Sequence, residues 1–240
     1  MKYILFINIL LLSVCVNAQT KITFPSQDGL TITADFYEGE KENPYILLFH
    51  QANSSKGEYK EIGNKLTKLG FNCLAVDLRS GKESNYVANE TAKLASEKGL
   101  PQAYIDSKQD IEAAIDYAFA KNKKSVVLFG SSYSASLSLL IANKNDKVQG
   151  VVAFSPGEFF QPSLDIKQSI YGFNKPAFVA SSQREYSYVF EFDSVIVSKS
   201  KTFFKPQNGQ GEHGAKSLWK TCETNREYWL ALMLFLKQFN

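Results

Sequence analysis

Short apolar runs recur along the chain, and segments with helical spacing of apolar residues separate them. A continuous apolar run is typical of a strand buried on both faces of a sheet. The predicted strands are YILLFH (45–50), FNCLAVDLR (71–79), KSVVLFG (124–130), VQGVVAFS (148–155), KPAFVASS (175–182) and KTFFKPQ (201–207). The predicted helices lie within residues 57–70, 106–120, 133–143 and 215–239, the last as one long helix.

The order of these segments predicts the fold class. Strand, helix and strand in succession form a βαβ unit, whose crossover is right-handed. Repeated alternation predicts an α/β domain with a mostly parallel sheet, and residues 21–39 predict an antiparallel hairpin in front of it. No repeat or linker marks a second domain, so residues 19–240 are predicted to form one domain. The longest irregular piece, residues 80–104, is expected to be a loop, a short cap or a rim of the active site.

The first 18 residues have the pattern of a secretory signal peptide. Lys2 supplies a positive start, an apolar run follows, and small residues precede a cleavage site after Ala18. We therefore expect an exported protein, periplasmic or secreted. Lipidation of Cys15 is the alternative, against which the bulky Val14 argues.

Composition and charge exclude several function classes. The chain has 240 residues, of which 44% are hydrophobic and 21% charged, as in a well-packed globular protein. Its net charge of +3 falls to +2 when Lys2 is removed. A surface so nearly balanced gives no electrostatic case for nucleic acid, and no segment after the first is long enough for stable membrane insertion.

The cysteines and histidines narrow the chemistry further. Cys73 lies in a predicted strand and Cys222 in the predicted C-terminal helix, so we expect buried thiols, with one disulfide between them as the alternative. With two histidines and no Cys/His cluster, the sequence predicts no zinc site and no other metal or cofactor. The oligomeric state is not encoded in any motif.

A sharp strand-to-helix corner identifies a candidate nucleophile. In FGSSYSASL, an apolar strand ends at Gly130 and a helical pattern begins at once. Ser132 occupies the central position of a motif that reads G-S-S-Y-S, close to the G-x-S-x-G nucleophile elbow. Ser131 could instead cap the helix, and the Gly-x-Ser spacing favours Ser132 over it as the nucleophile.

A base and an acid follow in the chain order that a Ser–acid–His triad requires. His213 lies in a glycine-rich loop between the last strand and the final helix, where it can reach the sheet edge. Glu185 follows the penultimate strand and is the favoured acid. Glu158 is the second candidate, and Asp193 is the third because its segment looks helical.

Other polar residues follow the strand ends. The second oxyanion donor is assigned to the backbone N–H of Ala52, with Gln51 as the alternative, beside the N–H of Tyr133. His50 is expected to brace its loop rather than act as a base. Asp77 and Arg79 are expected to brace the loop after residue 80, although an Arg79 facing the pocket would suit an anionic substrate.

The sequence resembles the α/β-hydrolase superfamily, in its dienelactone-hydrolase-like group. The resemblance rests on LLFHQANSSKGEY, FNCLAVDLRSG, FGSSYSASL and GEHG in that order and covers nearly all of residues 19–240. It implies a sheet of about eight mostly parallel strands with helices on both faces, and a Ser or Cys nucleophile with an acid and a histidine. Carried over, Ser132 is the nucleophile, His213 the base and Glu185 the acid. The elbow departs from the pattern at Ser134, where a second glycine is usual.

These features predict an exported serine hydrolase that cleaves an ester-like acyl bond through an acyl-enzyme. The expected partner is a small-molecule or short acyl substrate that reaches an open site, because the chain has little length beyond the core fold. A peptidase on the same fold is one alternative. A ligand-binding homologue without catalysis is the other.

Overall fold

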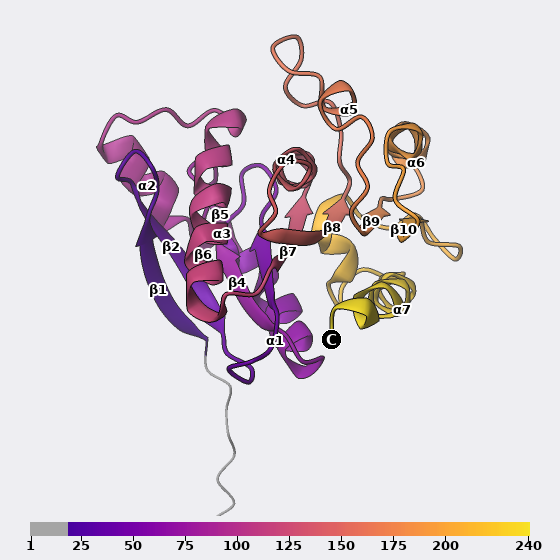
Figure 1. Cartoon of the computed structure of the whole chain (residues 1–240), viewed down its shortest axis with the longest axis horizontal. Coiled ribbons are helices and arrows are strands. Elements are labelled where there is room, and N and C mark those ends of the chain that lie inside the picture. The colour runs from indigo at the N-terminus through magenta and orange to yellow at the C-terminus, as the bar shows by residue number, and fades with distance from the viewer. Residues whose placement is uncertain (1–18) are drawn as a thin grey trace, which may run out of the picture.

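The computed structural model describes residues 19–240, and the predicted signal peptide of residues 1–18 lies outside them. An eight-stranded sheet forms the centre, in the order β1-β2-β4-β3-β7-β8-β9-β10 (Figure 1). β2 pairs antiparallel with β1 and with β4, and the pairs from β4 to β10 are parallel. This confirms the predicted mostly parallel sheet with an antiparallel hairpin in front.

The predicted strands agree with the observed ones to within a few residues. The strands of the main sheet are β1 (Thr20–Pro25), β2 (Thr31–Tyr37), β3 (Tyr45–Phe49), β4 (Asn72–Val76), β7 (Val126–Ser131), β8 (Val148–Phe154), β9 (Ala177–Ala180) and β10 (Lys201–Phe204). The helices are α1 (Lys60–Lys68), α2 (Glu90–Glu97), α3 (Lys108–Asn122), α4 (Tyr133–Ala142), α5 (Ile166–Ser169), α6 (Tyr186–Phe190) and α7 (Asn225–Leu236).

Helices cover both faces of the sheet because the central strands are apolar on both faces. In β3, Leu47 and Phe49 join the core on the side of α3 and α4, whereas Ile46 and Leu48 join the core on the side of α1 and α7. Both cores consist of buried apolar side chains, many of them aromatic. Apolar burial of this kind is the main source of stability in a domain of this size. The sheet edge where the parallel strands end is therefore held rigidly from both sides.

Two segments differ from the sequence expectation. Residues 80–104 are not wholly irregular, because they contain the short hairpin of β5 (Glu83–Ser84) and β6 (Val87–Ala88) and then α2. The predicted long C-terminal helix is wrong in its first half: a 3-10 turn (Gly214–Leu218) and further turns precede α7. The Trp219 indole N–H donates to Glu58 O across the molecule, which ties the chain down before a regular helix can begin.

The remaining expectations concern cysteines, metal sites and membrane spans. Cys73 and Cys222 are both buried free thiols, as predicted. Within residues 19–240 there is no grouping of three His, Cys, Asp or Glu side chains that could hold a metal ion. Over the same residues, every helix is too short or too polar to cross a bilayer.

Candidate active site

Ser132 lies on a strained backbone turn between β7 and α4. Its φ of 61° and ψ of −126° belong to a region that non-glycine residues rarely adopt, and such strain concentrates at functional sites. The side chain is 95% buried. A capping serine would need neither this backbone conformation nor this position, and Ser132 makes no capping hydrogen bond with its side chain.

The residues that flank the turn explain its sequence. A Cβ on Gly130 would lie 2.4–2.5 Å from backbone atoms of Ala135, so only glycine fits there. Ser134 stands where the motif usually has its second glycine. Its hydroxyl accepts from Ser131 N–H at 2.9 Å and lies 2.7 Å from Phe49 O, which it can donate to. A glycine at this position would let the helix and the strand pack closely. Ser134 instead joins the turn to β3 through hydrogen bonds.

Ser131 holds the histidine loop against the turn. Its buried hydroxyl accepts a 2.9 Å hydrogen bond from Ala215 N–H, two residues after His213. Gly214 has a φ of +68°, and a Cβ there would lie 2.4 Å from Ser131 Oγ. The loop of His213 is thus fixed beside Ser132, although within the described residues no hydrogen bond joins the Ser132 hydroxyl to the imidazole.

Glu185 and His213 are in direct contact. Nδ1 of the imidazole donates to Oε1 of the carboxylate. Oε2 accepts from the Ser155 hydroxyl at 2.7 Å, from the Ser182 hydroxyl at 2.9 Å and from Ser182 N–H at 3.1 Å. The His213 side chain is 42% exposed while Glu185 is largely buried, so the imidazole faces solvent and the carboxylate faces the protein interior.

The environment of Glu185 keeps it ionised. Burial by itself raises the pKa of this carboxyl, but the hydrogen bonds from His213 and Ser155, with the charge of the imidazolium and the backbone donor of Ser182, outweigh it and lower the pKa to about 2. A carboxylate that stays negative at every physiological pH can fix the tautomer of His213 and stabilise its protonated form.

The other two acid candidates lie away from the histidine. Glu158 accepts from the backbone N–H groups of Ile166 and Lys167 at 2.7 and 2.9 Å, and so caps α5. Asp193 forms an ion pair of 2.7 Å with Lys201. Both carboxylates have structural partners, and of the three candidates Glu185 is the one that contacts His213.

Two predicted oxyanion donors, one at the turn and one in the loop after β3, have backbone N–H groups without a partner among the described residues. Tyr133 is the first residue of α4, where an N–H has no partner within the helix. Within residues 19–240, neither Tyr133 N–H nor Ala52 N–H donates to another protein group. The alternative donor, Gln51 N–H, is already bound to Oε2 of Glu58 at 3.0 Å. Of the two predicted donors from the loop after β3, Ala52 is therefore the one available to a ligand.

His50 is a buried structural residue. Its Nε2 accepts from Leu78 N–H at 2.9 Å, so Nδ1 carries the proton and donates to Gln51 O at 2.8 Å. Burial lowers the pKa of His50, which keeps the ring neutral. The ring joins the loop after β3 to the loop after β4, the bracing position expected from the sequence.

Asp77 and Arg79 also have internal partners. Asp77 accepts from the Lys56 backbone N–H at 2.8 Å and from its ammonium at 2.7 Å. Arg79 is fully buried and is paired with Asp110 and Asp28, at 2.8 and 2.7 Å. Asp77 also accepts from Glu90 N–H at 3.0 Å, and Arg79 O accepts from the Gln102 side chain at 2.8 Å, so both residues brace the segment after residue 80 as predicted. The idea that Arg79 faces the pocket toward an anionic substrate is wrong, because two carboxylates enclose the guanidinium.

Sequence reasoning missed three polar residues around the site. Ser155 and Ser182 both donate to Glu185, and Glu58 supports the loop of Gln51. The available signal for the serines was their position, since Ser155 directly follows β8 and Ser182 lies two residues after the end of β9. Glu58 had no signal, because it lies at the start of a segment with amphipathic helical spacing.

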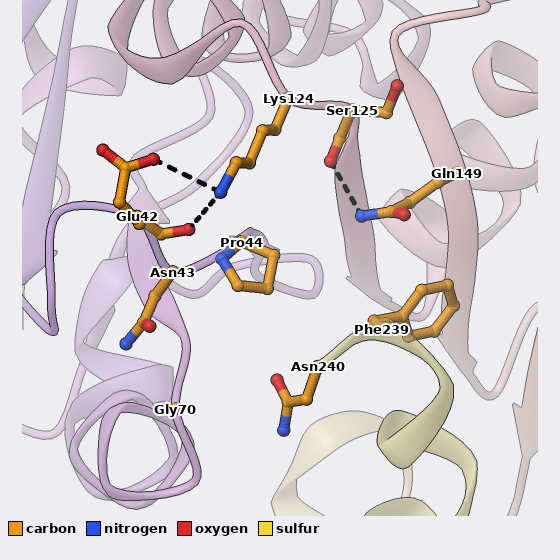
Figure 2. Close-up of a pocket in the computed structure, with 9 residues that line it drawn as sticks. All are labelled: Glu42, Asn43, Pro44, Gly70, Lys124, Ser125, Gln149, Phe239 and Asn240. Atoms are coloured by element: carbon orange, nitrogen blue, oxygen red, sulfur yellow. Dashed lines mark hydrogen bonds and ion pairs between the residues drawn. The ribbon is translucent and has the colours of Figure 1, made fainter.

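A cavity of about 630 Å³ lies at the opposite edge of the sheet. It is lined by residues near the first positions of β3, β7 and β8, including Pro44, Ser125 and Gln149, and by the C-terminal Phe239 (Figure 2). Lys124 is ion-paired with Glu42 at its rim. Ligands of open parallel sheets bind beyond the carboxyl ends of the strands, so this cavity is not the candidate active site despite its volume.

The comparisons with known proteins agree with this fold. A family model described as the dienelactone hydrolase family matches residues 32–188. An esterase of Pyrococcus furiosus is similar in structure, with a TM-score of 0.70 and 14% identity, over 92% of this chain and 93% of that one. A dienelactone hydrolase from Anabaena variabilis has a TM-score of 0.70 and 13% identity, over 92% and 98% of the two chains.

A peptidase also shares the fold. The acylaminoacyl peptidase of Pyrococcus horikoshii has a TM-score of 0.64 and 14% identity, over 92% of this chain and 41% of that one. At these identities the structural likeness shows the fold alone. No curated protein sequence matches the chain.

Proposed function

Because the chain belongs to the dienelactone hydrolase family, we propose that it is a serine hydrolase that cleaves ester-like acyl bonds, with Ser132 as nucleophile, His213 as base and Glu185 as acid. The observation that carries the proposal is the strained turn at Ser132, beside which Ser131 holds the loop of His213. The contact between Glu185 and His213 supports the assignment of the acid.

The proposed reaction has two halves. The Ser132 hydroxyl bonds to the acyl carbon while Nε2 of His213 takes its proton, and the carbonyl oxygen becomes an oxyanion. The N–H groups of Ala52 and Tyr133 stabilise this oxyanion. The bond to the alcohol then breaks, and the alcohol leaves with the proton from His213. Water, deprotonated by the same imidazole, then bonds to the acyl carbon. The bond from that carbon to Ser132 Oγ breaks, His213 returns the proton to Oγ, and the acid is released.

The first test is the intact mass of residues 19–240 after treatment with a fluorophosphonate. We expect one stoichiometric adduct on the wild type and on Ser125→Ala, a matched serine control at the opposite edge of the sheet. Ser132→Ala should gain no adduct, and His213→Ala should react far more slowly because the hydroxyl loses its base. A folded wild type that stays unlabelled would overturn the proposal and favour a ligand-binding protein without catalysis.

A second comparison separates an esterase from a peptidase, because both would react with the fluorophosphonate. Simple alkyl esters and N-acyl peptides of matched acyl group are offered to the same preparation. Esters are intrinsically more reactive than amides, so turnover of the peptides is the measurement that decides. We expect ester cleavage and no peptide cleavage above the level of Ser132→Ala. Peptide cleavage above that level would replace the ester assignment by the peptidase alternative.

We also propose that the precursor is exported and cleaved after Ala18. The positively charged start and the apolar run of residues 4–16 support this. Sequencing the N-terminus of the protein recovered from the cell envelope or medium should give Gln19. An N-terminus at Met1, or a lipid attached to Cys15, would contradict it.

A further inference from the structure

An apolar cavity of about 270 Å³ lies at the same sheet edge as Ser132. Residues 103–105, just before α3, line one wall, and residues 159–164, after β8, line the other. Tyr104, Ile105 and Phe159 are each 39% exposed, and no charged side chain lines the cavity. Large apolar side chains gathered in one hollow at the surface are typical of a binding site.

The first wall is attached to the residue that follows the nucleophile. The Tyr104 ring stacks on the ring of Tyr133, with centroids 4.5 Å apart. The Tyr133 hydroxyl in turn hydrogen-bonds to Ser80 Oγ at 2.7 Å, and Ser80 to Ser107 Oγ at 2.7 Å. These bonds fix the position of Tyr104 relative to the turn of Ser132.

The second wall is attached to the same first turn of α4. The Ser136 hydroxyl donates to Gly157 O at 2.8 Å and accepts from Gly157 N–H at 2.9 Å. The Phe159 ring folds back over Gly157, where a Cβ would lie 3.0 Å from it. Both walls are thus anchored within four residues of Ser132, so the cavity is held to the turn that carries the proposed nucleophile.

We propose that this cavity binds an uncharged, apolar part of the ester, a short alkyl chain or a single aryl ring. The inference rests on the proposed function, since it places the scissile bond at Ser132. The lining is mostly aromatic and aliphatic, with Gln161 and Ser163 as its polar side chains and no cation, and Arg79 is enclosed by carboxylates elsewhere. An anionic group would lose hydration there without gaining a positive charge as partner. The volume is just below that of sites for drug-sized ligands, which sets the size of the group.

The test compares four esters by titration of the released acid at constant pH. Ethyl hexanoate extends ethyl acetate by four methylenes on the acyl side, and hexyl acetate by four on the alcohol side. The monoethyl ester of succinic acid carries a negative charge instead. Each methylene buried in an apolar site contributes roughly fourfold in binding. We expect kcat/KM for either ethyl hexanoate or hexyl acetate to exceed that for ethyl acetate at least tenfold, and the succinate ester to be the poorest substrate.

Two variants locate the preference in this cavity. Ile105→Ala and Phe159→Ala should each reduce, at least threefold, the ratio of kcat/KM for the preferred six-carbon substrate to kcat/KM for ethyl acetate. Both side chains are exposed enough for the fold to tolerate the change. Leu230→Ala removes a 62% exposed leucine from α7 and is the matched control, for which the ratio should not change.

The outcomes separate this inference from the proposed function. Turnover of ethyl acetate without any preference for a longer ester, or a preference for the succinate ester, would overturn the inference and leave the hydrolase intact. A preference that survives both variants would place the apolar group elsewhere. If no ester is cleaved and the fluorophosphonate does not label Ser132, both proposals fall together.

Discussion

The Ser155 hydroxyl donates a 2.7 Å hydrogen bond to Oε2 of Glu185. The same hydroxyl accepts a 3.0 Å hydrogen bond from Gly214 N–H, the residue after His213. One serine at the end of β8 therefore positions both the acid and the histidine loop, although neither is close to it in sequence.

Ser155→Ala tests this positioning role. The variant removes a hydrogen bond to a charged acceptor and leaves Gly214 N–H without its partner, a loss of about 1.5–3 kcal/mol for such bonds. We expect kcat to fall about tenfold with little change in KM, because the imidazole is misplaced while substrate binding is not. Steady-state kinetics on an ester checks it, with Ser125→Ala at the far edge of the sheet as control. A purely structural serine would lower the melting temperature and leave kcat per folded molecule unchanged.

Glu185→Gln and Glu158→Gln separate the acid from a carboxylate that caps a helix. Glu185→Gln removes the charge that stabilises a protonated His213, and loss of the acid from such a triad costs about 10⁴ in kcat. Glu158→Gln should keep kcat within about twofold and lower the melting temperature, because Glu158 caps α5. A large loss of kcat in Glu158→Gln with little change in Glu185→Gln would assign the triad acid to Glu158.

The lowered pKa of Glu185 also predicts how stability depends on pH. Its folded-state pKa of about 2 lies below the ordinary value of 4.5, so the carboxylate stabilises the fold above pH 4.5 and loses this effect as the pH falls toward 2. The contribution is on the order of 2 kcal/mol, less than the full shift implies because His213 is part exposed. Unfolding of the wild type and Glu185→Gln in denaturant at pH 7, 4 and 2.5 should show a gap in stability that narrows with acid. A gap that stays constant would contradict the ionised state of Glu185.

Much of this organisation could be predicted from the sequence, for identifiable reasons. Buried strands such as residues 45–50 have unbroken apolar runs, and their alternation with helices leaves little freedom in topology. Chain order then placed Glu185 and His213 beyond neighbouring strands, where the structure brings them into contact.

What the sequence did not reveal depends on how segments meet in the folded chain. Ser155 is 30 residues from Glu185 and meets it only when β8 and β9 pair. Ser182 and Glu58 bind residues 3 and 7 positions away, in loops whose conformation the apolar pattern does not specify. The C-terminal helix was predicted too long because residues 215–224 have helical spacing, whereas the Trp219 indole bond to Glu58 O and the bond from Ala215 N–H to Ser131 hold them in turns. Tertiary contacts override local propensity there.

Ser134 offers a test of the unusual elbow. Its hydroxyl joins Ser131 N–H to the end of β3. Ser134→Ala leaves the buried Ser131 N–H without this acceptor, while Phe49 O keeps the Tyr59 hydroxyl as a donor, at a cost of about 1–3 kcal/mol. Ser134→Gly restores the usual motif but loses the same bonds and adds backbone freedom in α4. We therefore expect both variants to unfold at lower denaturant concentration than the wild type, the glycine variant first. If Ser134→Gly is as stable as the wild type, the hydroxyl is not what holds this turn.

Glu58 is a buried acidic residue for which a role in positioning the active-site loop is expected. It is fully buried, its Oε2 accepts from Gln51 N–H at 3.0 Å, and its Oε1 has no partner among the described residues. Burying the Glu58 side chain with one oxygen unpaired costs folding free energy. Its bond to Gln51 N–H fixes the loop in a conformation that leaves Ala52 N–H available to a ligand. Glu58→Ala should release that loop and lower kcat about tenfold with KM nearly unchanged, since an oxyanion donor acts in the transition state. Glu58→Gln keeps an oxygen acceptor for Gln51 N–H and should recover most of kcat, while Glu61→Ala, nearby on the exposed face of α1, is the control. Equal losses in Glu58→Ala and Glu58→Gln would show that the charge, rather than the hydrogen bond to Gln51, is what the site requires.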